Sequence, residues 1–309
     1  MAYQSATLIV CPQCVEDAWQ WVLSCVTPRP LTPCATCVYD EKLWCSDGTP
    51  CSLRTTAEIA SVMSRLYLTS QLVDLEAILQ MVSGANAPQV LVRGTSLDAE
   101  VGAVIDSQPR FRYALSEHLA FWTRLATAHR GLQGSRFGRT RPNLLPDDKG
   151  PDGLFASIGD VIELEVEEVK SSIGSPRSQL AGDVFRSTGR VEQPGRGTKT
   201  GRALEDFWLL ENGVVGFQRL EGKVGELCQS LRITTDQALR AGLISRCTYN
   251  VTVVADEQYS SADLFEGYEH VTSQVERRVA TYIGAQHWEA FAERVRGQVK
   301  QTLECAGVW

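Results

Sequence analysis

The chain has 309 residues, of which 43% are hydrophobic and 22% are charged, and its formal net charge is −7 at pH 7. This composition is ordinary for a soluble globular protein, and the length allows one large domain or two modest ones. There is no apolar run of about eighteen residues and no basic segment before the short apolar run near the N-terminus, so we expect no membrane span and no secretory signal, and we predict a cytoplasmic protein.

Cysteines concentrate at the N-terminal end. Two pairs have the form Cys-x-x-Cys, and their spacing resembles the two knuckles of a four-cysteine zinc ribbon. The predicted structural Zn²⁺ ligands are Cys11, Cys14, Cys34 and Cys37. Three alternatives stay open. In the first, Cys45 and Cys51 join Cys34 and Cys37 as zinc ligands and leave Cys11 and Cys14 free. In the second, the cysteines hold a [4Fe–4S] cluster, and in the third they are simply buried.

The segment after the cysteines has a helical pattern. Thr55 and Glu58 have the spacing of a capping box, and apolar residues then recur at three- and four-residue steps through residues 59–82. The pattern predicts one long helix or two, followed by a short strand at residues 89–93. We place a domain boundary near residue 105, with a Cys-rich, mostly helical module at residues 1–105 and an α/β domain at residues 106–309.

A second amphipathic helix is predicted at residues 111–128, and basic residues then surround a more acidic segment. Residues 124–141 contain five arginines and no acid, and residues 171–202 contain six basic residues against two acids. Basic loops of this kind suit the phosphodiester backbone of a nucleic acid, although ordinary solvated loops also carry such charge. The predicted nucleic-acid contacts are Arg136, Arg139, Arg141, Arg196 and Lys199.

Between these loops the sequence predicts a hairpin, with strands at residues 152–157 and 161–171. Side chains alternate between the two faces of a strand, so Glu168 and Lys170 share a face with apolar residues and should lie where the core opens. Charges are seldom placed there unless they pair or hold a metal. A salt bridge at the end of the sheet is the simpler interpretation. The other face carries acids that we expect to be solvated: Glu163, Glu165 and Glu167.

Further elements are predicted downstream of the hairpin. Residues 203–210 and 224–241 have helical patterns, and residues 247–255 form a β-branched run typical of a buried strand. The remainder, residues 262–304, is predicted to be one or two helices.

The acids and lysine of the hairpin resemble the signature of the PD-(D/E)xK nuclease superfamily. The match reads Pro151-Asp152 followed by Glu168-Val169-Lys170, and the resemblance covers roughly residues 111–256. It implies the restriction-endonuclease-like fold, a mixed α/β (α+β) sheet flanked by helices with the core order α-β-β-β-α-β. One strand of that core, expected between residues 131 and 151, is not evident, and the polar segment 139–145 is its candidate.

The resemblance also implies the roles of the site residues. Asp152 and Glu168 would coordinate Mg²⁺, and Lys170 would help to position and activate the attacking water. Many members add an acid from the first core helix, for which Glu117 is the candidate. Asp147 or Asp148 could take the place of Asp152, and Gln179 could assist from the segment after the lysine.

The leading functional hypothesis is therefore a Mg²⁺-dependent DNA endonuclease, in a bacterial defence or restriction setting, with a helicase, another ATPase or a different protein as partner. The alternative is a catalytically silent adaptor that has the same fold and binds nucleic acid or a larger enzyme. A third reading is an unrelated α/β scaffold, in which Asp152 and Glu168 would not converge.

Overall fold

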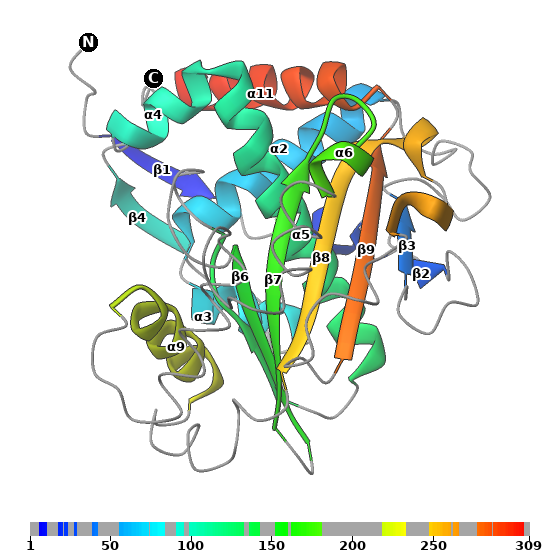
Figure 1. The fold of residues 1–309 in the computed structure, drawn as a ribbon. Helices are drawn as coiled ribbons and strands as arrows, with labels where there is room; N and C mark the ends of the chain where they lie inside the picture. The colour runs from blue at the N-terminus through cyan, green and yellow to red at the C-terminus, as the bar shows by residue number, and fades with distance from the viewer. Residues whose placement is uncertain are drawn as a thin grey trace.

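The computed structural model describes residues 6–10, 18–20, 22–23, 28–29, 39–42, 56–73, 75–83, 91–95, 99–132, 136–142, 152–159, 162–180, 218–232, 247–260, 262–265, 277–285 and 287–305. Their architecture is mixed α and β (Figure 1). None of the helices in these ranges is both long and apolar enough to cross a bilayer.

A mixed sheet organises the described residues. Its strand order is β2-β3-β9-β8-β7-β6-β5. The strands are β2 (Pro28–Arg29), β3 (Tyr39–Lys42), β5 (Arg136–Arg139), β6 (Gly153–Ile158), β7 (Ile162–Ser171), β8 (Cys247–Asp256) and β9 (Arg277–Ala285). Strands β5, β6 and β7 pair antiparallel, whereas β7, β8, β9 and β3 pair parallel. A separate antiparallel ribbon joins β1 (Ala6–Val10) to β4 (Leu91–Thr95).

Helices lie on both faces of the sheet. The long helix α5 (Gln108–Gly131) packs against β7, and α2 (Thr56–Leu72), α3 (Leu75–Val82), α4 (Ala99–Asp106) and α11 (Trp288–Cys305) surround it. Helix α9 (Gln218–Leu231) packs against β5 and β6 on the other face (Figure 1).

Neighbouring residues of β5 define these faces, because Gly138 lies under Ser230 and Leu231 of α9 while the Arg139 guanidinium lies over the Phe121 ring of α5. A Cβ at position 138 would overlap the Ser230 side chain, so a larger residue here fits only if Ser230 and Leu231 move. Short turns α6 (Arg177–Gln179), η2 (Glu257–Tyr259) and η3 (Ala262–Phe265) follow β7 and β8.

One buried apolar cluster crosses the predicted domain boundary. It contains Ile59 and Leu66 of α2, Phe121 of α5, Ile283 of β9 and Val295 of α11. The buried side chains of the described ranges therefore do not separate at residue 105, and the helices before this position share a core with the sheet that follows it.

Several predicted elements agree with the structure and others need correction. The hairpin strands and β8 occur where they were predicted, and the helical segment before residue 83 divides into α2 and α3. The strand missing from the sequence prediction is β5, which begins earlier than the proposed segment 139–145. The predicted helices at residues 262–304 are wrong in part, because β9 occupies Arg277–Ala285. Helix α9 begins and ends earlier than predicted, and residues 203–210 lie outside the described ranges.

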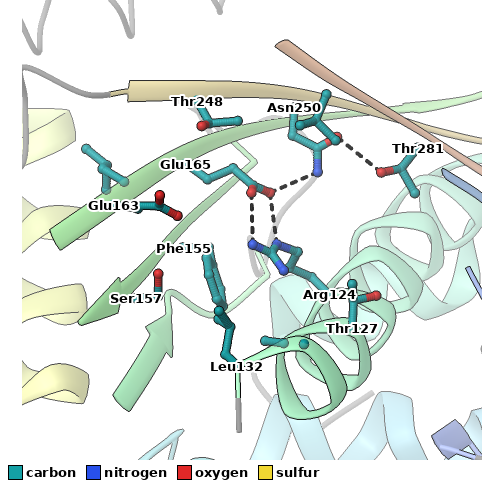
Figure 2. Close-up of a pocket in the computed structure, with 14 residues that line it drawn as sticks. Arg124, Thr127, Leu132, Phe155, Ser157, Glu163, Glu165, Thr248, Asn250 and Thr281 are labelled. Carbon is teal, nitrogen blue, oxygen red and sulfur yellow. Dashed lines mark hydrogen bonds and ion pairs between the residues drawn. The ribbon is translucent and has the colours of Figure 1, made fainter. Parts of the chain in front are cut away.

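The expectation that Glu165 and Glu167 are solvated is also wrong. Glu165 accepts two hydrogen bonds from Arg124 of α5, at 3.0 and 2.9 Å, and one from Asn250 of β8, at 2.9 Å (Figure 2). Glu167 pairs with Arg139 of β5 and accepts a hydrogen bond of 2.7 Å from Thr252. Both carboxylates are buried but compensated, and they fasten β7 to α5, β5 and β8 at once. Glu163 is exposed, as expected.

The Arg139–Glu167 pair gives a test of this packing. Arg139→Met would leave the Glu167 carboxylate buried without its cation, and we expect a loss of about 3–5 kcal/mol in the free energy of unfolding, measured by urea denaturation. The double variant Arg139→Met/Glu167→Leu should lose less than the sum of the two single changes. The control is Arg232→Ala, which breaks an ion pair with Glu76 whose side chains are 66% and 61% exposed, and it should cost less than about 1 kcal/mol. Equal losses in Arg139→Met and Arg232→Ala would contradict the assignment.

His118 provides a second test, at the contact between α5 and α2. Its ring nitrogens lie 2.5 Å from Ser70 Oγ and 2.9 Å from Gln71 Nε2, and its ring packs 4.4 Å from that of Tyr67. Burial, assisted by the nearby Arg139 charge, lowers the pKa of His118 from 6.5 to about 3. The folded protein therefore keeps this ring neutral at pH values where the unfolded chain protonates it.

The sign of the pH effect follows from this difference. Between about pH 6.5 and 3 the unfolded state binds the additional proton, so His118 should remove about 1.4 kcal/mol of stability for each unit by which the pH falls through this window. We expect His118→Gln to reduce the slope of stability against pH, measured by denaturant unfolding from pH 7 to 4. His287→Asn, at an exposed position whose φ of 52° asparagine tolerates, should keep the wild-type slope. An unchanged slope in His118→Gln would refute the assignment.

Candidate functional site

A cavity of about 280 Å³ lies at the end of β7. It is lined from α5 by Arg110, Tyr113, Ser116 and Glu117, from the start of β6 by Asp152, from the end of β7 by Glu168, Val169, Lys170 and Ser171, and from α6 by Gln179. The four residues predicted to be catalytic, together with Gln179, thus meet in one cavity from segments far apart in the sequence. Asp147 and Asp148, the alternatives to Asp152, lie outside the described residues.

Asp152 is held where β6 begins. Its main-chain N–H donates to the Glu167 carbonyl at 3.0 Å, and its Oδ2 accepts from the Val169 N–H at 2.7 Å. The carboxylate therefore spans the two strands just beyond the last pair of the ladder, and it is only 4% exposed. This bond orients one carboxylate oxygen toward β7, beside the acid and lysine of the motif.

Glu168 and Lys170 form an ion pair along one strand rather than across two. Lys170 Nζ lies 2.6 Å from Glu168 Oε1, and the lysine side chain is 15% exposed. The second oxygen of Glu168 is buried and has no hydrogen-bond partner among the described residues. A buried carboxylate oxygen without a partner is costly, and native structures seldom leave one unless a ligand or an ion satisfies it.

A second cavity shows the contrast. It measures about 250 Å³ and lies at the opposite end of β7, on the face covered by α5, with Arg124, Phe155, Glu163 and Asn250 among its lining residues (Figure 2). The polar side chains at its centre are hydrogen-bonded to one another. Arg124 and Asn250 both donate to Glu165, and Thr281 donates to Asn250 Oδ1 at 3.2 Å. Among the described residues that line this cavity, none carries a buried polar atom without a partner. The cavity at the end of β7 is therefore the stronger candidate for a functional site.

Lys223 of α9 interacts electrostatically with two acids of the cavity, Glu117 and Asp152, and the sequence did not reveal this. Burial lowers the pKa of its ammonium, while the carboxylates of Glu117, Asp152 and Glu226 act in the opposite direction. Helix α9 reaches this position because Glu226 accepts a 2.7 Å bond from the Arg141 N–H, and because Arg136 donates to the Leu231 carbonyl. In the sequence Lys223 is one charged residue of an amphipathic helix, and no local pattern connects it to the motif.

The residues predicted to contact nucleic acid are placed differently from one another. Arg136 is exposed but donates to α9, and Arg141 is half-buried. The prediction that Arg139 contacts nucleic acid is wrong, because its side chain is 1% exposed and is enclosed with Glu167 beneath the Phe121 ring. Arg139 therefore has no surface on which to meet a nucleic acid. Arg196 and Lys199 lie outside the described residues.

The donor set of the cavity suits a hard divalent cation. Mg²⁺ prefers oxygen ligands and takes few of them from protein, and Asp152, Glu168 and the Val169 carbonyl are the groups that would hold it. The Glu168 oxygen that has no partner among the described residues suits such an ion. Within the described ranges no three His, Cys, Asp or Glu residues form a metal-binding group among themselves, so a cation here would keep water in its coordination shell. The predicted zinc ligands, Cys11, Cys14, Cys34 and Cys37, lie outside the described residues.

Comparison of the chain with protein-family models, with curated proteins and with solved structures finds no match. The interpretation of the site therefore depends on its own chemistry.

Cation binding can be measured without any assay of activity. We expect Mn²⁺ to bind wild-type protein in isothermal titration calorimetry and to lose more than about tenfold in affinity in Glu168→Gln and Asp152→Asn, because the number of charged ligands sets the affinity for a hard cation. Glu163→Gln removes an exposed acid from the other face of the same strand and should bind Mn²⁺ as wild type does. Equal affinities in all four proteins would exclude a cation site in this cavity.

Proposed function

We propose that the protein is a divalent-metal-dependent nuclease that hydrolyses DNA phosphodiester bonds on a restriction-endonuclease-like core. The order of elements supports this, because α5, β5, β6, β7, α9 and β8 follow the sequence α-β-β-β-α-β that the resemblance implies. The pairing is also compatible, with β5-β6-β7 antiparallel and β8 parallel beside β7.

One observation carries the proposal. Asp152, Glu168 and Lys170 line a single cavity, and a carboxylate oxygen of Glu168 is buried with no hydrogen-bond partner among the residues that the structure describes. A structural salt bridge needs neither the convergence of Asp152 nor an unsatisfied oxygen. A cation held by the two carboxylates accounts for both.

The residues would divide the chemistry as follows. A bound Mg²⁺ supplies Lewis acidity toward the phosphate and a more acidic water. Asp152 and Glu168 hold the cation, and the Val169 N–H keeps the Asp152 carboxylate in place. Lys170, 2.6 Å from Glu168 Oε1, places a positive charge where negative charge develops on the phosphoryl group. Glu117 of the cavity lining and the nearby Lys223 add one charge of each sign, and burial strengthens these interactions.

Cleavage assays test the proposal. Asp152→Ala and Lys170→Ala should each abolish Mg²⁺-dependent cleavage of plasmid and oligonucleotide DNA, because one removes a cation ligand and the other the charge beside the phosphate. Circular dichroism and thermal melting should show that both variants remain folded. Glu163→Ala serves as the matched control and should cleave at the wild-type rate. Cleavage at the wild-type rate by both site variants would end the assignment.

A catalytically silent protein with the same core is the second candidate. The Glu168–Lys170 ion pair favours it, since the pair neutralises both groups in the absence of a cation. Such a protein would bind nucleic acid or a protein partner and would show no metal-dependent cleavage under any condition. The zinc module and an ATPase partner remain proposals for either candidate.

A further inference from the structure

Two large hydrophobic side chains are exposed among the described residues: Tyr113, which lines the acidic cavity, and Ile173, which follows its last lining residue on β7, Ser171, by two positions. Tyr113 is 40% exposed and lines the cavity from α5. Ile173 is 52% exposed and follows the end of β7, on a bend where Ser172 Oγ donates to the Gly174 carbonyl at 2.9 Å. Single exposed apolar residues are normal on a protein surface. Here one of them belongs to the cavity lining and the other lies three residues beyond Lys170, so both are candidates to contact a ligand with apolar faces.

A neighbouring side chain orients Tyr113, and hydrogen bonds hold the backbone that carries Ile173. The Arg112 guanidinium lies 5.2 Å from the centroid of the Tyr113 ring, and Arg112 is itself buried and 3.7 Å from Glu289. This contact orients the ring from the protein side. The bend that carries Ile173 is attached to the sheet because the Ser172 N–H donates to the Val254 carbonyl at 3.1 Å. Both apolar groups are therefore presented by rigid elements.

Positive charge accompanies the apolar groups. Arg110 lies one turn before Tyr113 on α5 and lines the same cavity, and the exposed Arg177 begins the turn that carries Gln179. Aromatic and aliphatic side chains beside arginines are the surface that single-stranded nucleic acid needs, because bases stack on the former and phosphates pair with the latter. The carboxylates lie deeper, where a cation would separate them from the phosphate.

We propose that Tyr113 and Ile173 contact unstacked bases of single-stranded DNA whose backbone enters the acidic cavity, so that unpaired DNA and not intact duplex is the preferred substrate. The inference rests on the proposed nuclease function, since it takes the acidic cavity as the place where the phosphate is bound. Base–aromatic stacking contributes about 1–3 kcal/mol for each base, whereas a duplex must first lose its own stacking at a cost of a few kcal/mol. Tyr113 and Ile173 therefore favour single-stranded DNA over duplex DNA.

Binding of two DNA probes tests the inference. Fluorescein-labelled oligo-dT and a blunt duplex of equal length would be titrated by fluorescence anisotropy in CaCl₂, with full-length wild type, Tyr113→Ala, Tyr113→Phe and Ile173→Ser. Wild type should bind oligo-dT more tightly than the duplex. Tyr113→Ala should weaken oligo-dT binding by about 5- to 150-fold, which corresponds to the stacking of one base, and should change duplex binding by less than about twofold. Tyr113→Phe keeps the ring and should bind as wild type does.

Ile173→Ser is an independent probe at a more exposed position, and it should weaken oligo-dT binding in the same selective way. Tighter binding of the duplex by wild type would overturn the inference. So would an unchanged affinity of Tyr113→Ala for oligo-dT, or equal losses on both probes. The proposed function is scored separately, by cleavage in MgCl₂. A protein that binds oligo-dT through Tyr113 but cleaves neither DNA would refute catalysis and keep this inference, whereas cleavage without any Tyr113 effect would keep catalysis and refute the inference.

Discussion

The compensation of buried carboxylates on β7 is the constraint on which the rest of the structure depends. Glu165 and Glu167 face α5, and each is satisfied by an arginine and by a hydrogen-bond donor from β8. Glu168 faces the other way, and within the described part of the chain only one of its oxygens has a partner, Lys170. Burying a charge is tolerated when it is paired and hydrogen-bonded. The two compensated acids therefore stabilise the fold, and the half-compensated acid is the one that can serve a ligand.

Helix α5 connects the fold to the site. Its Arg124 pairs with β7, its His118 contacts α2, and its Tyr113 and Glu117 line the acidic cavity. The position of the cavity wall is thus set by packing that extends from the apolar cluster of α2 and α11 to the charged face of β7. A change in this packing would shift Tyr113 and Glu117 relative to Asp152 without altering any residue of the motif itself.

The sequence predicts the local part of this arrangement and misses the distant part. Strand periodicity places Glu168 and Lys170 on one face at the end of a buried strand, and a hairpin brings Asp152 beside them, as the structure has it. The same periodicity suggests that Glu165 and Glu167 are solvated, because acids that alternate with apolar residues resemble an exposed face. Their partners Arg124 and Arg139 lie 41 and 28 positions away in the sequence, on a helix and on a strand of little apolar character. No local sequence pattern therefore indicates the two ion pairs. The position of Lys223 depends in the same way on how α9 docks.

Crystals of the protein soaked in MnCl₂ would test most directly whether the unsatisfied oxygen belongs to a cation site. Anomalous diffraction at the manganese edge should give a peak between Asp152 and Glu168, at about 2.0–2.3 Å from Glu168 Oε2, as expected for a hard cation held by carboxylates. A saturated soak that leaves this position without a peak, while Lys170 keeps its contact with Glu168, would show that the acids and lysine form only a structural ion pair.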